Sequence, residues 1–223
     1  MGEQLKEVST AGIQDIHRIQ RSFRSVMNAS ARPGKVFAMA RPEEGSSQHF
    51  GVDISLAILV KMFIDQAVSF CVVSTEAPSI AKAIQSETHA SLAPFESAAF
   101  LVIPQAKNGS LSDAAIESAY GGNLHSPETG ASILLGCEYL ASQEEEEEEL
   151  GSEDTLYWVS VEGPGIQDSH VFGIDCLNWL WARQRRKDEF PCGIEIILVD
   201  RRGRVVVIPR TSFLSVLATE GEV

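Results

Sequence analysis

An arginine and a threonine follow the second strand of a hairpin that the sequence predicts near the end of the chain. Six of the seven residues from 193 to 199 are apolar or glycine, which predicts a strand buried on both faces. Asp-Arg-Arg-Gly then predicts a tight turn, and the second strand ends at Pro209, which cannot donate to a sheet ladder. The guanidinium of Arg210 and the hydroxyl of Thr211 thus follow the carboxyl end of a strand, where α/β sheets commonly bind ligands. The pair predicts a ligand site, and the competing interpretation is a strand end with a solvated arginine.

Three other patterns point only weakly to binding or catalysis. Gly-Pro-Gly-Ile at 163–166 follows a predicted strand, as a phosphate-cradling loop would. It lacks the third glycine of the dinucleotide fingerprint, and Pro164 removes one backbone amide, so a conformational turn at Pro164 and Gly165 is favoured. Ser79 and Lys82 fit a Ser-x-x-Lys pattern whose companion motifs are missing. No lysine stands in a recognisable pyridoxal-phosphate context, so no bound cofactor is expected.

Neither the cysteines nor the histidines have the spacing of a metal site. The four cysteines lie far apart and form no Cys-x-x-Cys pair. Cys71 and Cys137 fall in apolar segments, where a free cysteine behaves as a small hydrophobic residue. We expect no metal and no disulfide.

Helices and strands alternate in the first half of the chain, and strands dominate the second. Asp53, and Ser112 together with Asp113, are predicted to cap the starts of helices. Apolar periodicity predicts helices over 13–29, 53–65, 77–88, 112–120 and 174–187, and strands over 35–40, 68–74, 98–103, 132–140 and 155–161. The order predicts an α/β layered domain with a mixed β-sheet.

The composition is that of an ordinary globular protein of 223 residues, with 44% hydrophobic and 22% charged residues. No run of eighteen apolar residues and no signal-peptide pattern is found, which predicts a cytoplasmic protein without a membrane span. The formal charge of −13 argues against nucleic-acid binding through the general field of the protein.

Two terminal segments and one internal segment are predicted to lie outside the core. We expect a flexible arm at 1–12, a single domain over 13–218 and a flexible tail at 219–223. Six consecutive glutamates at 144–149 repel one another, so residues 143–153 are predicted to form an acidic surface loop.

Five short motifs, in this order, resemble those of the H subunit of the bacterial carbon–phosphorus lyase core complex, the PhnH family. They are Ser-Phe-Arg at 22–24 with Pro-Gly at 33–34, Pro-Glu-x-Gly-Ala at 127–131, Gly-Pro-Gly-Ile at 163–166, Phe-Pro-x-Gly-Ile-Glu at 190–195 and Ile-Pro-Arg-Thr at 208–211. The resemblance covers roughly residues 13–215. Glu195 and Ser212 depart mildly from the family pattern, which usually has Asp and Thr there, and the acidic run is an insertion.

The resemblance implies both a fold and a role. The fold of the H subunit is similar to a reduced pyridoxal-phosphate-dependent transferase without the cofactor. The H subunit works with the G, I and L subunits, which together displace adenine from MgATP with an alkylphosphonate and form ribose 1-phosphonate 5-triphosphate. The J subunit, a radical enzyme, joins the same core. We therefore expect a non-catalytic subunit that forms a homodimer and docks onto partner subunits.

Within the motifs, the candidates for a ligand site or an interface are Arg24, Glu128, Pro164, Gly165, Arg210 and Thr211. Arg24 and Arg210 are predicted to face phosphonate or triphosphate oxygens, and Glu128 or His125 to orient a hydroxyl. In the slightly favoured alternative, Arg24 pairs with an acid such as Glu128 or Glu195 and locks the first helix to the sheet. Two further functions remain open: a free-standing enzyme with a cleft lined by Arg24, Glu128 and Arg210, or a nucleotide-binding module.

Overall fold

The computed structural model describes residues 10–40, 48–107, 109–143 and 156–217, with side chains from residue 17 onward. The acidic run at 144–149, the predicted tail and most of the predicted arm lie outside these ranges, and α1 (Thr10–Ala31) begins within the segment predicted as an arm. The predicted class, α/β with a mixed sheet, is confirmed.

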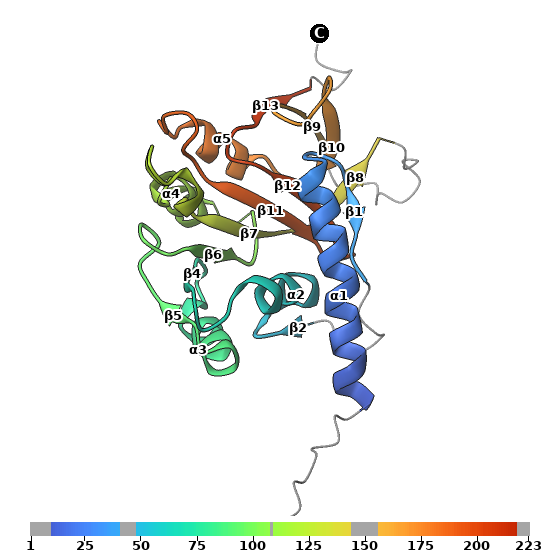
Figure 1. Ribbon diagram of the computed structural model, residues 1–223, viewed down its shortest axis with the longest axis vertical. Coiled ribbons are helices and arrows are strands. Elements are labelled where there is room, and N and C mark those ends of the chain that lie inside the picture. Colours follow the sequence, from blue (N-terminus) through green and yellow to red (C-terminus); the bar gives the residue numbers. More distant parts are fainter. Residues whose placement is uncertain (1–9, 41–47, 108, 144–155, 218–223) are drawn as a thin grey trace, which may run out of the picture.

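A seven-stranded sheet runs through the centre of the domain (Figure 1), in the order β1-β12-β11-β7-β6-β4-β5. Its strands are β1 (Phe37–Ala38), β4 (Ser69–Val72), β5 (Ser91–Leu92), β6 (Phe100–Ile103), β7 (Ser132–Cys137), β11 (Glu195–Asp200) and β12 (Arg204–Ile208). The five strands from β11 to β5 are mutually parallel, whereas β12 runs antiparallel to β11 and β1 antiparallel to β12. The sheet therefore has an edge where the parallel strands begin, here the amino edge, and an opposite carboxyl edge where they end.

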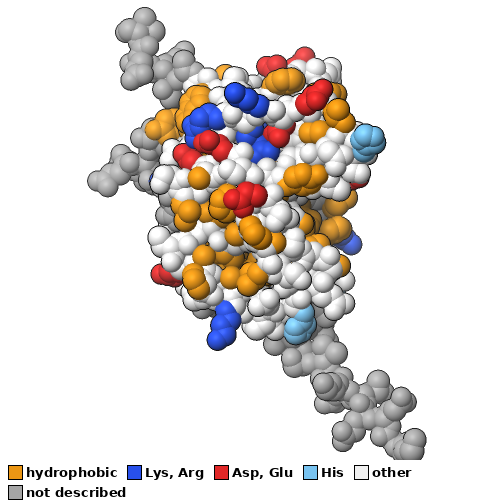
Figure 2. All heavy atoms as spheres, turned by 90° about the vertical axis from the view of Figure 1, so that its left-hand side faces the viewer, with side chains coloured by type: hydrophobic (Ala, Val, Ile, Leu, Met, Phe, Trp, Pro, Cys, Tyr) orange, Lys and Arg blue, Asp and Glu red, His pale blue; other side chains and the backbone are white. Residues whose placement is uncertain are grey.

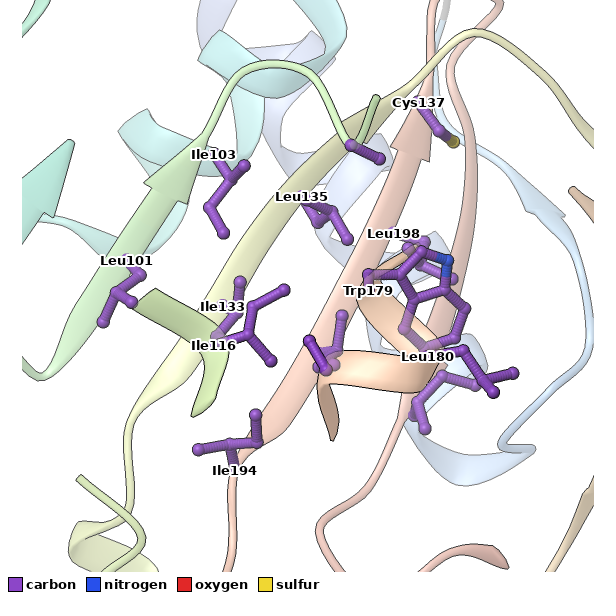
Figure 3. Packing of buried hydrophobic residues seen from close by; sticks show 14 of the residues in the cluster. Leu101, Ile103, Ile116, Ile133, Leu135, Cys137, Trp179, Leu180, Ile194 and Leu198 are labelled. Carbon is purple, nitrogen blue, oxygen red and sulfur yellow. The ribbon is translucent and has the colours of Figure 1, made fainter. Parts of the chain in front are cut away.

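Alternate residues of the central strands enter two separate hydrophobic cores, because successive side chains of a strand point to opposite faces. On β7, Leu134 packs with α1, α2 (Ile54–Phe63) and α3 (Ala77–Thr88). Its neighbours Ile133 and Leu135 pack on the other face with α4 (Ser110–Ser118) and α5 (Asn178–Gln184), where Trp179 is 1% exposed (Figure 3). Burial on both faces explains why the central strands are apolar throughout.

A second sheet, in the order β13-β9-β10-β8, packs beside α5 and completes the second core. It consists of β8 (Leu140–Ser142), β9 (Tyr157–Glu162), β10 (His170–Ile174) and β13 (Phe213–Val216), all antiparallel. The remaining elements are a small hairpin, β2 (Gln48–His49) with β3 (Val52–Asp53), and the 3-10 turn η1 (Pro127–Thr129). In the described ranges, no helix has both the length and the apolar character of a membrane span.

Two predicted helix starts are wrong. The last helix, predicted from residue 174, begins at Asn178, because residues 170–174 pair on one side with β9 and on the other with β8. The helix predicted to be capped by Ser112 and Asp113 begins at Ser110 instead, after Gly109 at a φ of 65°. By contrast, Asp53 caps α2 as predicted, with its Oδ1 accepting from the Ser55 amide at 2.8 Å.

A buried ion pair fixes the hairpin of β11 and β12. The Asp200 side chain is fully buried, and its Oδ2 accepts from Arg204 Nε at 2.8 Å and from the Leu140 amide at 3.1 Å. Its Oδ1 accepts from the amides of Arg202 and Arg204. Arg204 also lies over the Tyr139 ring, 4.2 Å from its centroid. One carboxylate thus links the turn of the final hairpin to the start of the second sheet.

Replacing this carboxylate is expected to destabilise the domain strongly. Asp200→Asn removes the buried negative charge that Arg204 Nε contacts at 2.8 Å, and breaking a buried ion pair of this kind costs about 3 kcal/mol or more. The free energy of unfolding, measured by denaturant titration, should fall by that amount. Asp168→Asn, an identical change at an exposed position, is the control and should be neutral. Equal stability of the two variants would contradict the assignment.

Candidate functional site

Four of the five motif segments meet at the amino edge of the central sheet. Glu195 and Ser132 begin the neighbouring parallel strands β11 and β7, so the segments at 190–195 and 127–131 both lead into this edge. Because β12 is antiparallel to β11, with Ile208 opposite Ile196, its carboxyl end returns to the same edge. Arg210 therefore follows the end of its own strand, as predicted, but lies where the parallel strands begin.

Glycines allow the backbones of these segments to touch. The Gly193 amide donates to Gly121 O at 2.7 Å. A Cβ atom on Gly130 would lie only 2.3 Å from Gly193 O, so no side chain fits there. The Arg210 Nη1 atom donates to Pro127 O and ties the end of β12 to η1. Gly130 and Gly193 thus allow the backbones of these segments to approach each other, and Arg210 joins the end of β12 to η1.

The loop at 163–166 packs against the turn that contains Thr211 and Ser212. A Cβ atom on Gly163 would lie 3.2 Å from Ser212 Cα and 3.3 Å from Thr211 O. Pro164 and Gly165, the predicted candidates, are both exposed, and Gly165 has a φ of 85°. The loop is a turn supporting the end of β12, which agrees with the favoured interpretation of its sequence.

Arg183 of α5 holds the turn after β12 from inside. Its Nη2 atom donates to Pro209 O at 3.0 Å, to Arg210 O at 3.2 Å and to Ser212 O at 3.0 Å. Burial, and to a smaller extent the nearby Arg186, lowers the pKa of Arg183 from 12.5 to about 10. The guanidinium remains positive at neutral pH and is partly desolvated.

These elements enclose a concavity of about 300 Å³, here called the amino-edge pocket. Its polar side chains are those of Arg183, Gln184, Arg186, Asp188, Arg210, Thr211 and Ser212, and its remaining lining residues are Phe190, Cys192, Gly193, Ile194 and Phe213. Arg186 pairs with Asp188 through a bond of 2.6 Å from Nε to Oδ2. The pocket therefore joins two predicted residues, Arg210 and Thr211, to an arginine of α5 that the sequence did not single out.

Arg24 lies far from this pocket. It is exposed on α1, next to Ser25, whose hydroxyl donates at 2.6 Å to Ala38 O on β1. Ala38 pairs with Arg204, at the start of β12, so Arg24 is level with the carboxyl edge and does not share a cleft with Arg210. Among the described residues it forms no ion pair, and the predicted alternative of a pair with Glu128 or Glu195 is not formed.

The other motif residues have structural contacts or face solvent. Ser22 is fully buried, and its Oγ accepts from the Ala40 amide at 3.2 Å. Glu128 and His125 are exposed near η1. Gly34 has a φ of 79°, and a Cβ atom on it would lie only 2.7 Å from Val161 Cγ2, so no side chain fits there.

A second concavity, of about 390 Å³, lies at the carboxyl edge over the ends of β6, β7 and β11. Lys107 Nζ lies 3.0 Å from Asp175 Oδ2, and Asp175 Oδ1 accepts from the amides of Glu138 and Tyr139. Arg201 pairs with Glu138 at 2.8 Å. This carboxyl-edge pocket was not predicted, although several of its residues directly follow apolar strands, which is the signal that could have indicated it.

The cysteines near the carboxyl edge are protonated. Burial, followed by the charge of Asp175, raises the pKa of Cys176 to about 12, and the same two causes raise the pKa of Cys137 well above its usual value. All four cysteines are free thiols. In the described part of the chain, no three His, Cys, Asp or Glu side chains are grouped as metal ligands would be.

The structure has an α/β fold with a mixed sheet, closed at its amino edge by four of the five motif segments. A family model described as "Bacterial phosphonate metabolism protein (PhnH)" matches residues 11–215, and the chain belongs to this family. The resemblance drawn from the five motifs is thereby confirmed. A search of the curated proteins returned no match.

Glu195, the acidic residue of the 190–195 motif, allows the electrostatics of the amino edge to be tested. Burial raises the pKa of Glu195, and Arg210 lowers it by a smaller amount. Because the folded pKa lies above the ordinary 4.5, stability should fall as the pH rises from 4.5 through the folded pKa. Glu195→Gln should remove this decrease and be the more stable protein at pH 7.

Thermal unfolding from pH 3.5 to pH 8 measures both curves. Glu128→Gln, the same change at an exposed position near the pocket, should follow the unmodified protein. In Arg210→Gln, loss of the attractive guanidinium should raise the pKa of Glu195 further and extend the fall in stability to higher pH. Superimposable curves for Glu195→Gln and the unmodified protein would refute this account.

Proposed function

We propose that this chain is a subunit of the carbon–phosphorus lyase system in organophosphonate catabolism. With the G, I and L subunits it supports transfer of an alkylphosphonate to the ribose of ATP, forming ribose 1-methylphosphonate 5-triphosphate from methylphosphonate. In that step a phosphonate oxygen bonds to the anomeric carbon and the bond to adenine breaks. The family match over residues 11–215 is the observation that carries the proposal.

The proposed task of this chain is assembly rather than chemistry on the substrate. Trp181, Phe190 and Phe213 are 43%, 71% and 73% exposed around α5 and the amino edge. On the face that contains α4 and α5, Figure 2 shows charged side chains gathered toward the upper end, with hydrophobic side chains both beside and below them. Exposed aromatic residues beside arginines are typical of protein interfaces. We assign the surface formed by Trp181, Phe190 and Phe213, here called the aromatic rim, to contact with a partner subunit.

Further features of the subunit follow from the same assignment and belong to the proposal. The chain forms a homodimer, acts in the cytoplasm, and binds no cofactor of its own while the complex uses MgATP. The J subunit joins the same assembly. The domain is a reduced relative of the pyridoxal-phosphate-dependent transferases.

A second candidate function is a free-standing enzyme or a nucleotide-binding module that acts on a phosphorylated small molecule. The observation that favours it is the amino-edge pocket, where Arg183 and Arg210 place two guanidiniums beside the Thr211 hydroxyl. Such a protein would turn over its substrate, or form a saturable ATP complex, in the absence of other subunits.

Co-purification with the G, I, J and L subunits, followed by an assay of adenine release, decides between the two. Adenine release from ATP and methylphosphonate should require this chain, and the chain alone should release none. Phe190→Asp places a charge in the aromatic rim and should abolish co-purification. Leu92→Asp, at a 51% exposed position on β5, is the matched control and should leave assembly unchanged. Turnover by the chain alone would overturn the subunit assignment.

A further inference from the structure

The amino-edge pocket concentrates positive charge on a chain whose formal charge is −13. Three guanidiniums line it, and the Arg186 charge is matched by Asp188. Within the described ranges, no carboxylate lies within ion-pair distance of Arg183 or Arg210. Glu195 acts on Arg210 only at longer range, and it does not line the pocket. Asp188, paired with Arg186, acts on Arg183 likewise only at longer range, so neither guanidinium is neutralised by a carboxylate in contact with it.

Both guanidiniums still have unused hydrogen-bond donors. The Nη2 atom of Arg183 donates its hydrogen bonds to backbone carbonyls, and the Nη1 atom of Arg210 donates to Pro127 O. The Nε and second Nη atoms of both residues have no partner among the described residues, yet none is sealed from solvent. Because the carbonyls fix the orientation of each guanidinium, these donors are preorganised rather than mobile.

The remaining walls suit a small ligand with an apolar part. A Cβ atom on Gly193 would lie 3.3 Å from Arg210 Cβ, so the absence of a side chain keeps the floor beside Arg210 open. Thr211 and Ser212 bring hydroxyl groups to the same wall. Phe190 and Phe213, at 71% and 73% exposure, form apolar sides at the mouth. The volume of about 300 Å³ is at the lower end of the range for small-molecule sites.

We infer that the amino-edge pocket binds the tetrahedral oxyanion of an organic phosphate or phosphonate, with its organic substituent against Phe190 and Phe213. A tetrahedral oxyanion carries up to two charges and three terminal oxygens, which match two guanidiniums and the neighbouring hydroxyls. A carboxylate carries one charge and two oxygens, and would leave one arginine unbalanced. The site is independent of subunit association, and it is a binding site with no catalytic step assigned to it.

Isothermal titration calorimetry of the full chain, without partner subunits, tests the inference. The probes are phenylphosphonate, methylphosphonate, inorganic phosphate and, as the carboxylate comparison, acetate. Phenylphosphonate should bind most tightly because its ring meets the two phenylalanines, methylphosphonate and phosphate more weakly, and acetate not measurably. ATP as a fifth probe distinguishes a phosphate ester from a phosphonate as the preferred source of the same oxyanion.

Matched variants locate the site. Arg210→Gln should weaken phenylphosphonate binding about ten- to a hundredfold, because a charge-assisted bidentate contact is lost. Arg24→Gln makes the same charge change on α1 near the opposite edge and should leave the affinity unchanged. Phe213→Ala should bring phenylphosphonate down to the affinity of methylphosphonate. Arg183→Gln removes a positive charge and also the hydrogen bonds that hold the turn after β12. If Arg183→Gln unfolds for this reason, the result for Arg210→Gln decides the test.

Three outcomes would overturn the inference: no binding of any of the phosphorus ligands, equal binding of acetate, or equal weakening by Arg24→Gln and Arg210→Gln. In the first case the two guanidiniums belong to the docking surface and meet acidic side chains of a partner. That result would leave the proposed subunit function intact, since co-purification and adenine release are measured separately. Conversely, if the chain binds the oxyanion but does not associate with the other subunits, the ligand site is supported and the subunit assignment is refuted.

Discussion

The fully buried carboxylate of Asp200 is the constraint on which the placement of the amino-edge pocket depends. Together with Arg204 it closes a short turn, and a short turn forces β12 to run back antiparallel along β11. Because β12 returns, Pro209 and Arg210 arrive at the end of the sheet opposite to the turn itself. The same carboxylate accepts from the Leu140 amide, which fixes the start of β8 and with it the second sheet. The ion pair of Asp200 with Arg204 at the carboxyl edge thereby determines which residues lie at the amino edge.

Local signals in the sequence predicted the elements that depend on local interactions. Helix α3 has the predicted bounds, and α2 begins where the side chain of Asp53 caps it. Strand β10 was missed because residues 170–174 are stabilised by β8 and β9, which are distant in sequence and which no local pattern reveals.

The candidate site shows the same division between residues that local patterns indicate and residues that only the fold brings together. Arg210 and Thr211 could be named from a strand that ends in proline. Arg183 could not, because it contacts the carbonyls of Pro209 and Ser212 from a helix 26 and 29 residues earlier in the chain. Arg24 was grouped with them by motif alone, and its place on α1 is set by contacts with β1 and β12.

The two pockets differ in how their charges are balanced. At the carboxyl edge Asp175, Glu138 and Asp200 each have a cationic partner, Lys107, Arg201 and Arg204 respectively, at 2.8 to 3.0 Å. The cations that line this pocket, Lys107 and Arg201, are thus each paired with a carboxylate, so it offers little to an anionic ligand. At the amino edge Arg183 and Arg210 are held by carbonyl oxygens, which orient a guanidinium without neutralising it. Position in the sheet favours the carboxyl edge as a binding site, but the balance of charge favours the amino edge, and charge decides the chemistry of a ligand.

The proposed ligand site draws on motif and non-motif residues alike: Phe190, Arg210 and Thr211 lie in the motifs, whereas Arg183, Ser212 and Phe213 lie outside them. Gly130 and Gly163 permit backbone contacts, while Arg210 is the motif side chain that reaches the pocket with free donors. Arg183 and Phe213, which complete the pocket, lie outside the motifs. In this chain four motif segments close one edge of the sheet through backbone contacts, and α5 adds the arginine that completes the pocket formed there.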